Sequence, residues 1–122
     1  MSVHKSISAI SSCRDIIQCA YNLNDLEVEV FRAASRQGPW RADELADQMG
    51  KERSTVYRAL QKLISCGMCV RETRSMEKGG YYHVYSAIPH DVLRGRLELC
   101  VEEWSKRMKD VLARFDENYA ME

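Results

Sequence analysis

The fold of this chain is decided by residues 42–64, which read ADELADQMGKERSTVYRALQKLI. In the first part of this stretch, Leu45, Ala46 and Met49 form one apolar face of a short helix, and Gly50 supplies the permissive backbone that ends it. In the second part, apolar residues recur at the spacing of a helix that is buried along one stripe. They are Val56, Ala59, Leu60, Leu63 and Ile64. The stretch therefore predicts two short helices around a tight corner.

The opposite face of the second predicted helix carries hydrogen-bond donors and long basic groups, with almost no acid among them. Its members lie three or four residues apart and are Arg53, Ser54, Tyr57, Arg58 and Gln61. Arginine and glutamine can read base edges in a major groove, whereas serine, tyrosine and arginine can hold phosphates. This pattern favours a helix-turn-helix, although two short amphipathic helices around a glycine also occur in helical domains that bind no nucleic acid.

The residues after this helix change to an alternating pattern rich in valine, threonine and tyrosine. Two such runs, 69–74 and 81–87, are separated by SMEKGG, which predicts a hairpin with a Gly-Gly turn. Three basic residues of the hairpin, Arg71, Arg74 and Lys78, lie where a wing would meet the sugar-phosphate backbone or an adjacent minor groove. Taken singly, each is also explained as a solvated hairpin charge, but the order helix, helix, basic hairpin favours a wing.

The candidate DNA contacts therefore come from a recognition helix over about residues 53–65 and a wing over residues 69–87. We expect residues near the helix N-terminus, Arg53 above all, to read base edges, and we expect the wing to meet the backbone. The full set is Arg53, Ser54, Thr55, Tyr57, Arg58, Gln61, Lys62, Arg71, Arg74 and Lys78.

Charge is distributed unevenly, although 18 basic and 18 acidic residues make the formal net charge zero. Residues 51–89 contain seven basic and three acidic residues, whereas the segments on either side each have a net charge of −2. A basic middle between mildly acidic ends is typical of a positive footprint on an otherwise neutral protein.

Helical patterns flank this region on both sides. On the N-terminal side they predict a first helix over about residues 6–21 and a second helix that starts after Asn24, with Glu27 completing a capping box, and stops at Gly38-Pro39. On the C-terminal side, a long helix starts at Pro89 and reaches about residue 118. Its apolar positions step by three or four residues, close to a coiled-coil seam. They are Leu93, Leu97, Cys100, Trp104, Met108, Val111 and Phe115.

About thirty residues make roughly 45 Å of helix, which is longer than the rest of so small a domain could cover. We therefore expect a homodimer through this helix, with Ile10 and Ile17 of the first helix joining the interface. A helix that folds back within its own chain is the alternative. The predicted fold is mainly α with a small β-hairpin wing: residues 1–22 form a dimer contact, residues 23–88 a winged helix-turn-helix and residues 89–122 a dimerisation helix.

No pattern for catalysis or metal binding accompanies these elements, since His4, His83 and His90 have no carboxylate or nucleophile at a motif spacing. We expect neither an enzyme nor a cofactor, and no metal. The C-x-x-C pair Cys66 and Cys69 could form a thiol switch, but partly buried core thiols are the favoured interpretation.

Cysteine usage and hydropathy also indicate the compartment. Five cysteines at irregular spacing argue against a secreted disulfide scaffold, and no apolar run reaches the length of a membrane span. We therefore expect a cytoplasmic protein without a membrane partner. No residue pattern points to a particular small-molecule effector.

Several of these motifs together resemble the winged helix-turn-helix part of archaeal TrmB-type regulators and, more loosely, the MarR superfamily. The resemblance covers roughly residues 24–118 and rests on Gly38-Pro39, ADELA (42–46), RSTVYRAL (53–60), Gly67, the run from Tyr85 to Pro89 and the long helix that follows. It implies a dimeric transcriptional regulator that places its second helix in the major groove of double-stranded DNA.

The chain departs from that family pattern at the corner of the two helices. Lys51 and Glu52 replace the apolar residue and small cap that are usual there, and Arg41 replaces the usual cap of the first helix. The sequence stops where full-length TrmB proteins continue into a sugar-binding domain, so the resemblance does not imply sugar sensing. An alternative function is a winged-helix module of the transcription machinery that docks a protein without sequence-specific DNA binding.

Overall fold

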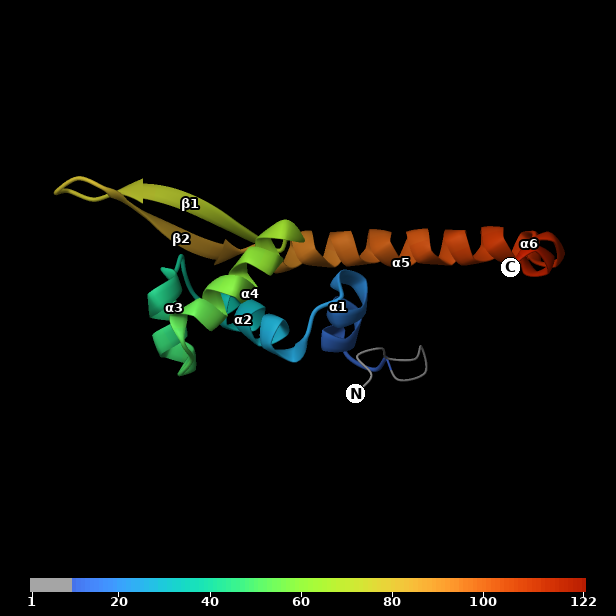
Figure 1. Ribbon diagram of the computed structural model, residues 1–122, viewed down its shortest axis with the longest axis horizontal. Helices are drawn as coiled ribbons and strands as arrows, with labels where there is room; N and C mark the ends of the chain where they lie inside the picture. Colours follow the sequence, from blue (N-terminus) through green and yellow to red (C-terminus); the bar gives the residue numbers. More distant parts are fainter. Residues whose placement is uncertain (1–9) are drawn as a thin grey trace.

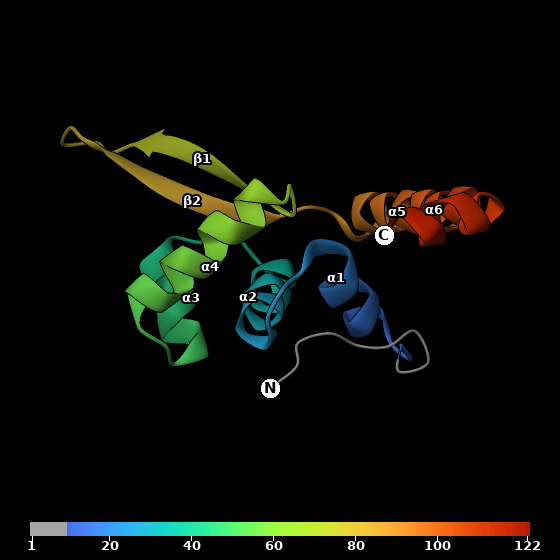
Figure 2. The same cartoon turned by 45° about the vertical axis from the view of Figure 1, so that its right-hand side comes forward.

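A computed structural model describes residues 10–122 of the chain, and within them six helices and one β-hairpin follow one another. Their order is α1 (Cys13–Tyr21), α2 (Asp25–Arg36), α3 (Ala42–Met49), α4 (Arg53–Ser65), β1 (Cys69–Ser75), β2 (Tyr81–Ala87), α5 (His90–Ala113) and α6 (Phe115–Met121). Helices α2, α3 and α4 form a body from which the hairpin projects on one side and α5 extends on the other (Figure 1). The view in Figure 2 shows the same separation of hairpin and α5. The predicted class, mainly α with a small β-hairpin wing, is confirmed.

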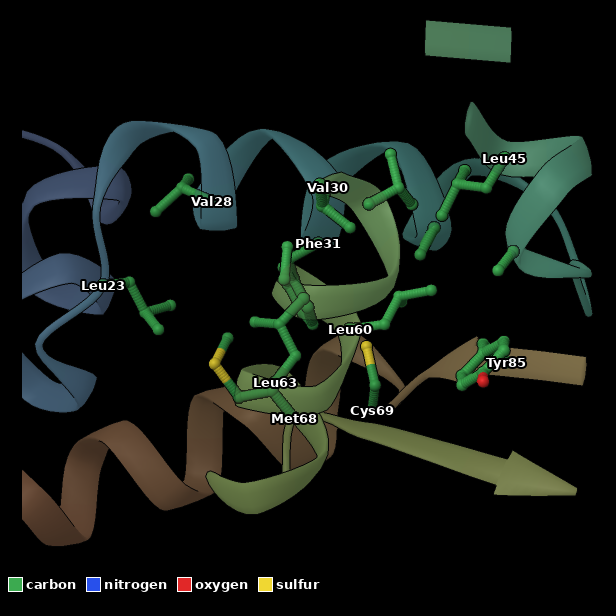
Figure 3. Packing of buried hydrophobic residues seen from close by; sticks show 14 of the residues in the cluster. Leu23, Val28, Val30, Phe31, Leu45, Leu60, Leu63, Met68, Cys69 and Tyr85 are labelled. Carbon is green, nitrogen blue, oxygen red and sulfur yellow. The ribbon is translucent and has the colours of Figure 1, made fainter. Parts of the chain in front are cut away.

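The core lies where α2, α3 and α4 pack against the base of the hairpin and the first turn of α5. The apolar stripe of α4 points into it: Val56, Leu60 and Leu63 are fully buried. Figure 3 shows Leu60 and Leu63 meeting side chains from α2 and from the start of β1. Because this stripe is buried, the opposite face of α4 is turned to solvent.

Local capping signals define the ends of α2 and α3. The Asn24 side chain accepts from the Glu27 N–H at 2.8 Å, and the Glu27 carboxylate accepts from the Asn24 N–H at 2.9 Å, so the predicted capping box is present. At the start of α3, the Glu44 carboxylate accepts from the Arg41 N–H at 2.8 Å. Gly50 ends α3 in the left-handed conformation, with φ of 65°.

The hairpin is antiparallel, and its register runs from Cys69 opposite Ala87 to Ser75 opposite Tyr81. Trp40 forms an isolated bridge with Tyr85, in which the two backbone N···O distances are 2.9 and 2.7 Å. Strand β2 therefore lies between β1 and the short extended segment at Trp40. This pairing fixes the hairpin beside the starts of α3 and α4.

Two predicted helices differ from the structure. The first helix begins at Cys13, and the part of the prediction that falls on residues 6–9 lies outside the described residues. The C-terminal helix is not continuous to residue 118, because it breaks at Arg114, where φ is −117° and ψ is 30°. At this break the Val111 carbonyl accepts from the Arg114 N–H at 3.1 Å and from the Asn118 side-chain amide at 3.5 Å. Within residues 10–122, no helix is both long enough and apolar enough to cross a membrane.

Candidate nucleic-acid interface

The exposed face of α4 is the centre of the candidate interface. Arg53, Ser54, Tyr57 and Arg58 are all exposed, as the sequence predicts. Ser54 and Arg58 are one turn apart and lie opposite the buried stripe, whereas Arg53 and Tyr57 lie on the side of the hairpin. The Arg53 guanidinium is 5.6 Å from the centroid of the Tyr57 ring. The face thus presents two arginines in different surroundings.

Three further α4 residues differ in exposure from this face. Thr55, Gln61 and Lys62 are half-buried. The Lys62 ammonium lies 3.5 Å from the backbone carbonyl of Asn22, so this side chain is directed toward the segment between α1 and α2. The Gln61 side-chain nitrogen is buried, without a hydrogen-bond partner in the described part of the chain. These positions are therefore less available to DNA than the sequence pattern indicates.

The base of the hairpin is joined to the α4 face through Tyr85. Its ring is buried, and Arg71, the residue paired with it on β1, is one of the charged groups near its hydroxyl. Burial is the main cause that raises the pKa of Tyr85; the neighbouring Tyr57 also raises it, while the positive charges of Arg71 and Arg53 lower it. The Tyr85 hydroxyl is thus a neutral group at the junction of α4 and the wing.

The basic residues farther along the hairpin have different partners. The Arg74 guanidinium is 2.7 Å from the Glu72 carboxylate, and this hydrogen bond is the main cause that raises the pKa of Arg74. Lys78 is exposed in the turn between the strands. The hairpin therefore offers Lys78 as a solvated cation, whereas Arg74 already has a carboxylate partner.

A cleft of about 410 Å³ lies between the start of α3, the start of α4 and β2. Its lining includes two arginines, Arg41 and Arg53, and one acid, Asp43. The Arg41 guanidinium is 5.0 Å from the centroid of the Tyr82 ring. From the sequence, Arg41 is predicted only to be an unusual helix cap, because nothing in the local pattern indicates that this residue faces the hairpin.

The two cysteines of the C-x-x-C pair lie in different environments. Cys69 is 2% exposed, and its sulfur points into the core (Figure 3). Burial raises the pKa of its thiol to about 12. A neutral buried thiol such as that of Cys69 is a poor nucleophile. Cys66, by contrast, is half-buried. This arrangement favours core thiols over a thiol switch.

The predicted seam on the C-terminal helix is divided between two environments. Leu93 is buried in the core and Leu97 packs against it, so these two residues face their own chain. Ile17 of α1 packs against the same core, while Ile10, Cys100 and Trp104 are half-buried. Met108, Val111 and Phe115 are 50%, 53% and 50% exposed. The distal half of α5 and the start of α6 therefore present an apolar surface that the described part of the chain leaves open.

Comparisons with known proteins agree with this geometry. Residues 17–91 match the family described as "Sugar-specific transcriptional regulator TrmB". The uncharacterized protein MJ1503 of Methanocaldococcus jannaschii is 32% identical over 94 residues, which cover 77% of this chain and 71% of the relative.

Two solved structures are similar in fold. A protein described as a possible transcriptional regulator from Methanosarcina mazei Go1 aligns with a TM-score of 0.76 at 23% identity and covers 90% of this chain and 94% of its own. MarR of Staphylococcus aureus aligns with a TM-score of 0.51 at 17% identity over 81% of this chain and 63% of its own. The fold is that of a winged-helix regulator, and by the match over residues 17–91 the chain belongs to the TrmB family of transcriptional regulators.

Proposed function

We propose that the protein is a homodimeric, sequence-specific transcriptional regulator that binds double-stranded DNA with α4 in the major groove and the wing on the backbone or in the adjacent minor groove. The observation that carries the proposal is that the exposed face of α4 adjoins the base of the hairpin. Tyr85 of β2 has Arg71 of β1 and Tyr57 and Arg53 of α4 as neighbours. A docked duplex would meet both elements at once.

Within this proposal, Ser54 and Arg58 are the base-reading residues, because they lie opposite the buried stripe of α4. Thr55 and Gln61 flank them. Arg71, Arg74 and Lys78 supply positive charge to the backbone, and Lys62 is the least available of the basic contacts because its ammonium is directed toward Asn22. We rank Lys78 above Arg74 as a backbone contact, since Glu72 already pairs with the Arg74 guanidinium.

The homodimer is proposed to form through the distal half of α5 with α6. Met108, Val111 and Phe115 continue the seam of Cys100 and Trp104, and these three lie well beyond Leu97, which packs against the core. Phe115 stacks on Tyr119 of α6 at a centroid distance of 5.3 Å, which enlarges this apolar surface. A second copy of the same surface would cover it by two-fold symmetry.

A gel-shift titration with fragmented genomic DNA at low and moderate salt tests the DNA-binding part. We expect binding that weakens with salt and a subset of fragments that remains bound at moderate salt; sequencing that subset gives the operator. Arg58→Ala should abolish the preference for this subset over other fragments. Arg32→Ala, which alters an exposed arginine of α2, is the matched control. If the wild type shows no salt-dependent binding, the protein-docking function of a winged-helix module takes its place.

A further inference from the structure

The cleft between α3, α4 and β2 brings together two cations that are twelve positions apart in the sequence. Arg41 immediately precedes α3, and Arg53 is the first residue of α4. Both line the same space of about 410 Å³, together with tyrosines of α4 and β2. The turn between the two helices therefore places both guanidinium groups beside the hairpin.

Each guanidinium is held against an aromatic ring. Arg41 lies 5.0 Å from the Tyr82 ring centroid, and Arg53 lies 5.6 Å from that of Tyr57. An aromatic ring contacts the flat face of a guanidinium and leaves the N–H groups on its edge able to donate to an oxyanion. The tyrosines thus orient the two arginines without occupying their donors.

The charge of the cleft suits an anion. Asp43 is the single acidic residue among those that line it, and its carboxylate lies 3.6 Å from the Nε of Arg41. That contact involves only the Nε of Arg41. Because the cleft is lined by two guanidinium groups and one carboxylate, it has an excess of positive charge. Arg41 and Arg53 are both exposed, so a group carried on a large molecule can reach them from solvent.

We infer that this cleft seats a phosphodiester of the DNA strand that passes from α4 to the wing, held by Arg41 and Arg53, with Tyr82 as a positioning residue for Arg41. The inference rests on the proposed function and adds a backbone contact to it. The sequence pattern predicts that Arg53 reads bases, whereas its place in the cleft beside the wing assigns it to the backbone. The cleft lies between the start of α4 and β2, so in the proposed docking a strand that passes from α4 to the hairpin would cross it.

The test is a scan in which single phosphates of a selected duplex are replaced by neutral methylphosphonates. The proteins are the wild type, the double variant Arg41→Ala, Arg53→Ala and the control Arg32→Ala. We expect one position in each half-site at which the neutral linkage lowers the DNA affinity of the wild type and of the control about tenfold. At that position the neutral linkage should not change the affinity of the double variant. The double variant should also lose the same factor on selected and random duplexes, because phosphates carry no sequence information.

Other outcomes are equally clear. If the wild type binds duplexes and no methylphosphonate position loses its effect in the double variant, the inference fails and the proposed function stands. A double variant that loses affinity for the selected duplex alone would return Arg53 to base reading. If the wild type binds no duplex, both fail. Unchanged circular dichroism and melting temperature of the variants exclude a folding defect.

Two further measurements separate the source of the oxyanion and the role of Tyr82. Millimolar inorganic phosphate, followed by NMR of the free protein, should leave the resonances of Tyr82 and His83 in place; a saturable shift there without coupling in the scan would mean that the cleft takes a free anion and would overturn the inference. In the methylphosphonate scan, Tyr82→Ala should reduce the loss of affinity that the neutral linkage causes at that phosphate. Tyr82→Phe, which keeps the ring, should show the same loss as the wild type.

Discussion

Tyr85 shows how one residue joins the core to the candidate DNA face. Its backbone pairs with Trp40, its ring is buried, and Arg71 lies opposite it on β1, near its hydroxyl. Residues directly opposite each other on antiparallel strands lie on one face, so Arg71 shares a face of the hairpin with the Tyr85 ring. A residue that serves packing therefore also lies beside basic side chains of the candidate DNA face.

Cys69 gives a prediction at the same scale. Burial raises the pKa of its thiol from 9.0 to about 12, so the folded protein retains a proton that the unfolded chain loses above pH 9. The stabilisation is complete below pH 9 and is lost as pH rises toward 12. We expect the free energy of unfolding to fall by about 1 kcal/mol between pH 8 and pH 10 through this group.

Urea denaturation at several pH values measures this effect, and Cys69→Val is the matched control because valine cannot ionise and is similar in size. The difference in unfolding free energy between wild type and variant should change with pH in that window. Parallel pH profiles for the two proteins would show that the Cys69 thiol does not contribute.

At the scale of elements, α4 and the hairpin are predicted to divide recognition between them. Arg58→Ala should cost about 1 to 3 kcal/mol on a selected operator and much less on random DNA, because it removes a base contact. Lys78→Ala should weaken both duplexes alike and reduce the salt slope by about one, because it removes a phosphate contact. Binding isotherms on both duplexes at several salt concentrations measure the two effects. The reverse pattern would exchange the two roles.

The elements also show what the sequence can predict. The capping box of Asn24 and Glu27, the buried stripe of α4 and the Gly-Gly hairpin depend on residues close in sequence, and all three are present. The break at Arg114 has no glycine or proline to signal it; it is accompanied by contacts such as that of Asn118 with Val111. The Arg41 cleft needs the pairing of Trp40 with Tyr85, which no local pattern contains.

The same distinction applies to the candidate site. The helical spacing on α4 correctly predicts that Arg53, Ser54 and Arg58 are exposed. It does not predict that Arg53 faces the hairpin or that the Lys62 ammonium is directed toward Asn22, because both depend on how separate elements pack.

At the scale of the whole molecule, the distal part of α5 extends away from the body (Figure 1). It carries exposed apolar residues. We predict that Met108→Glu with Val111→Glu converts a dimer into a folded monomer, because both side chains lie on the proposed interface. Leu99→Glu is the control, since Leu99 is 59% exposed on the other side of α5. Sedimentation velocity at micromolar concentration measures the result. A wild type that sediments as a monomer there would contradict the proposal.

The last prediction concerns the operator. A two-fold dimer presents two copies of α4, so the selected DNA should be an inverted repeat whose half-sites lie about one helical turn, 10 to 10.5 base pairs, or a multiple of it apart. Inserting five base pairs between the half-sites turns one of them to the opposite side of the duplex and should abolish cooperative binding. The Met108→Glu, Val111→Glu variant should bind a single half-site with the affinity of a monomer and ignore the insertion. If the wild type is equally insensitive to spacing, its two recognition helices do not act on one operator, and dimerisation through α5 would serve some purpose other than DNA recognition.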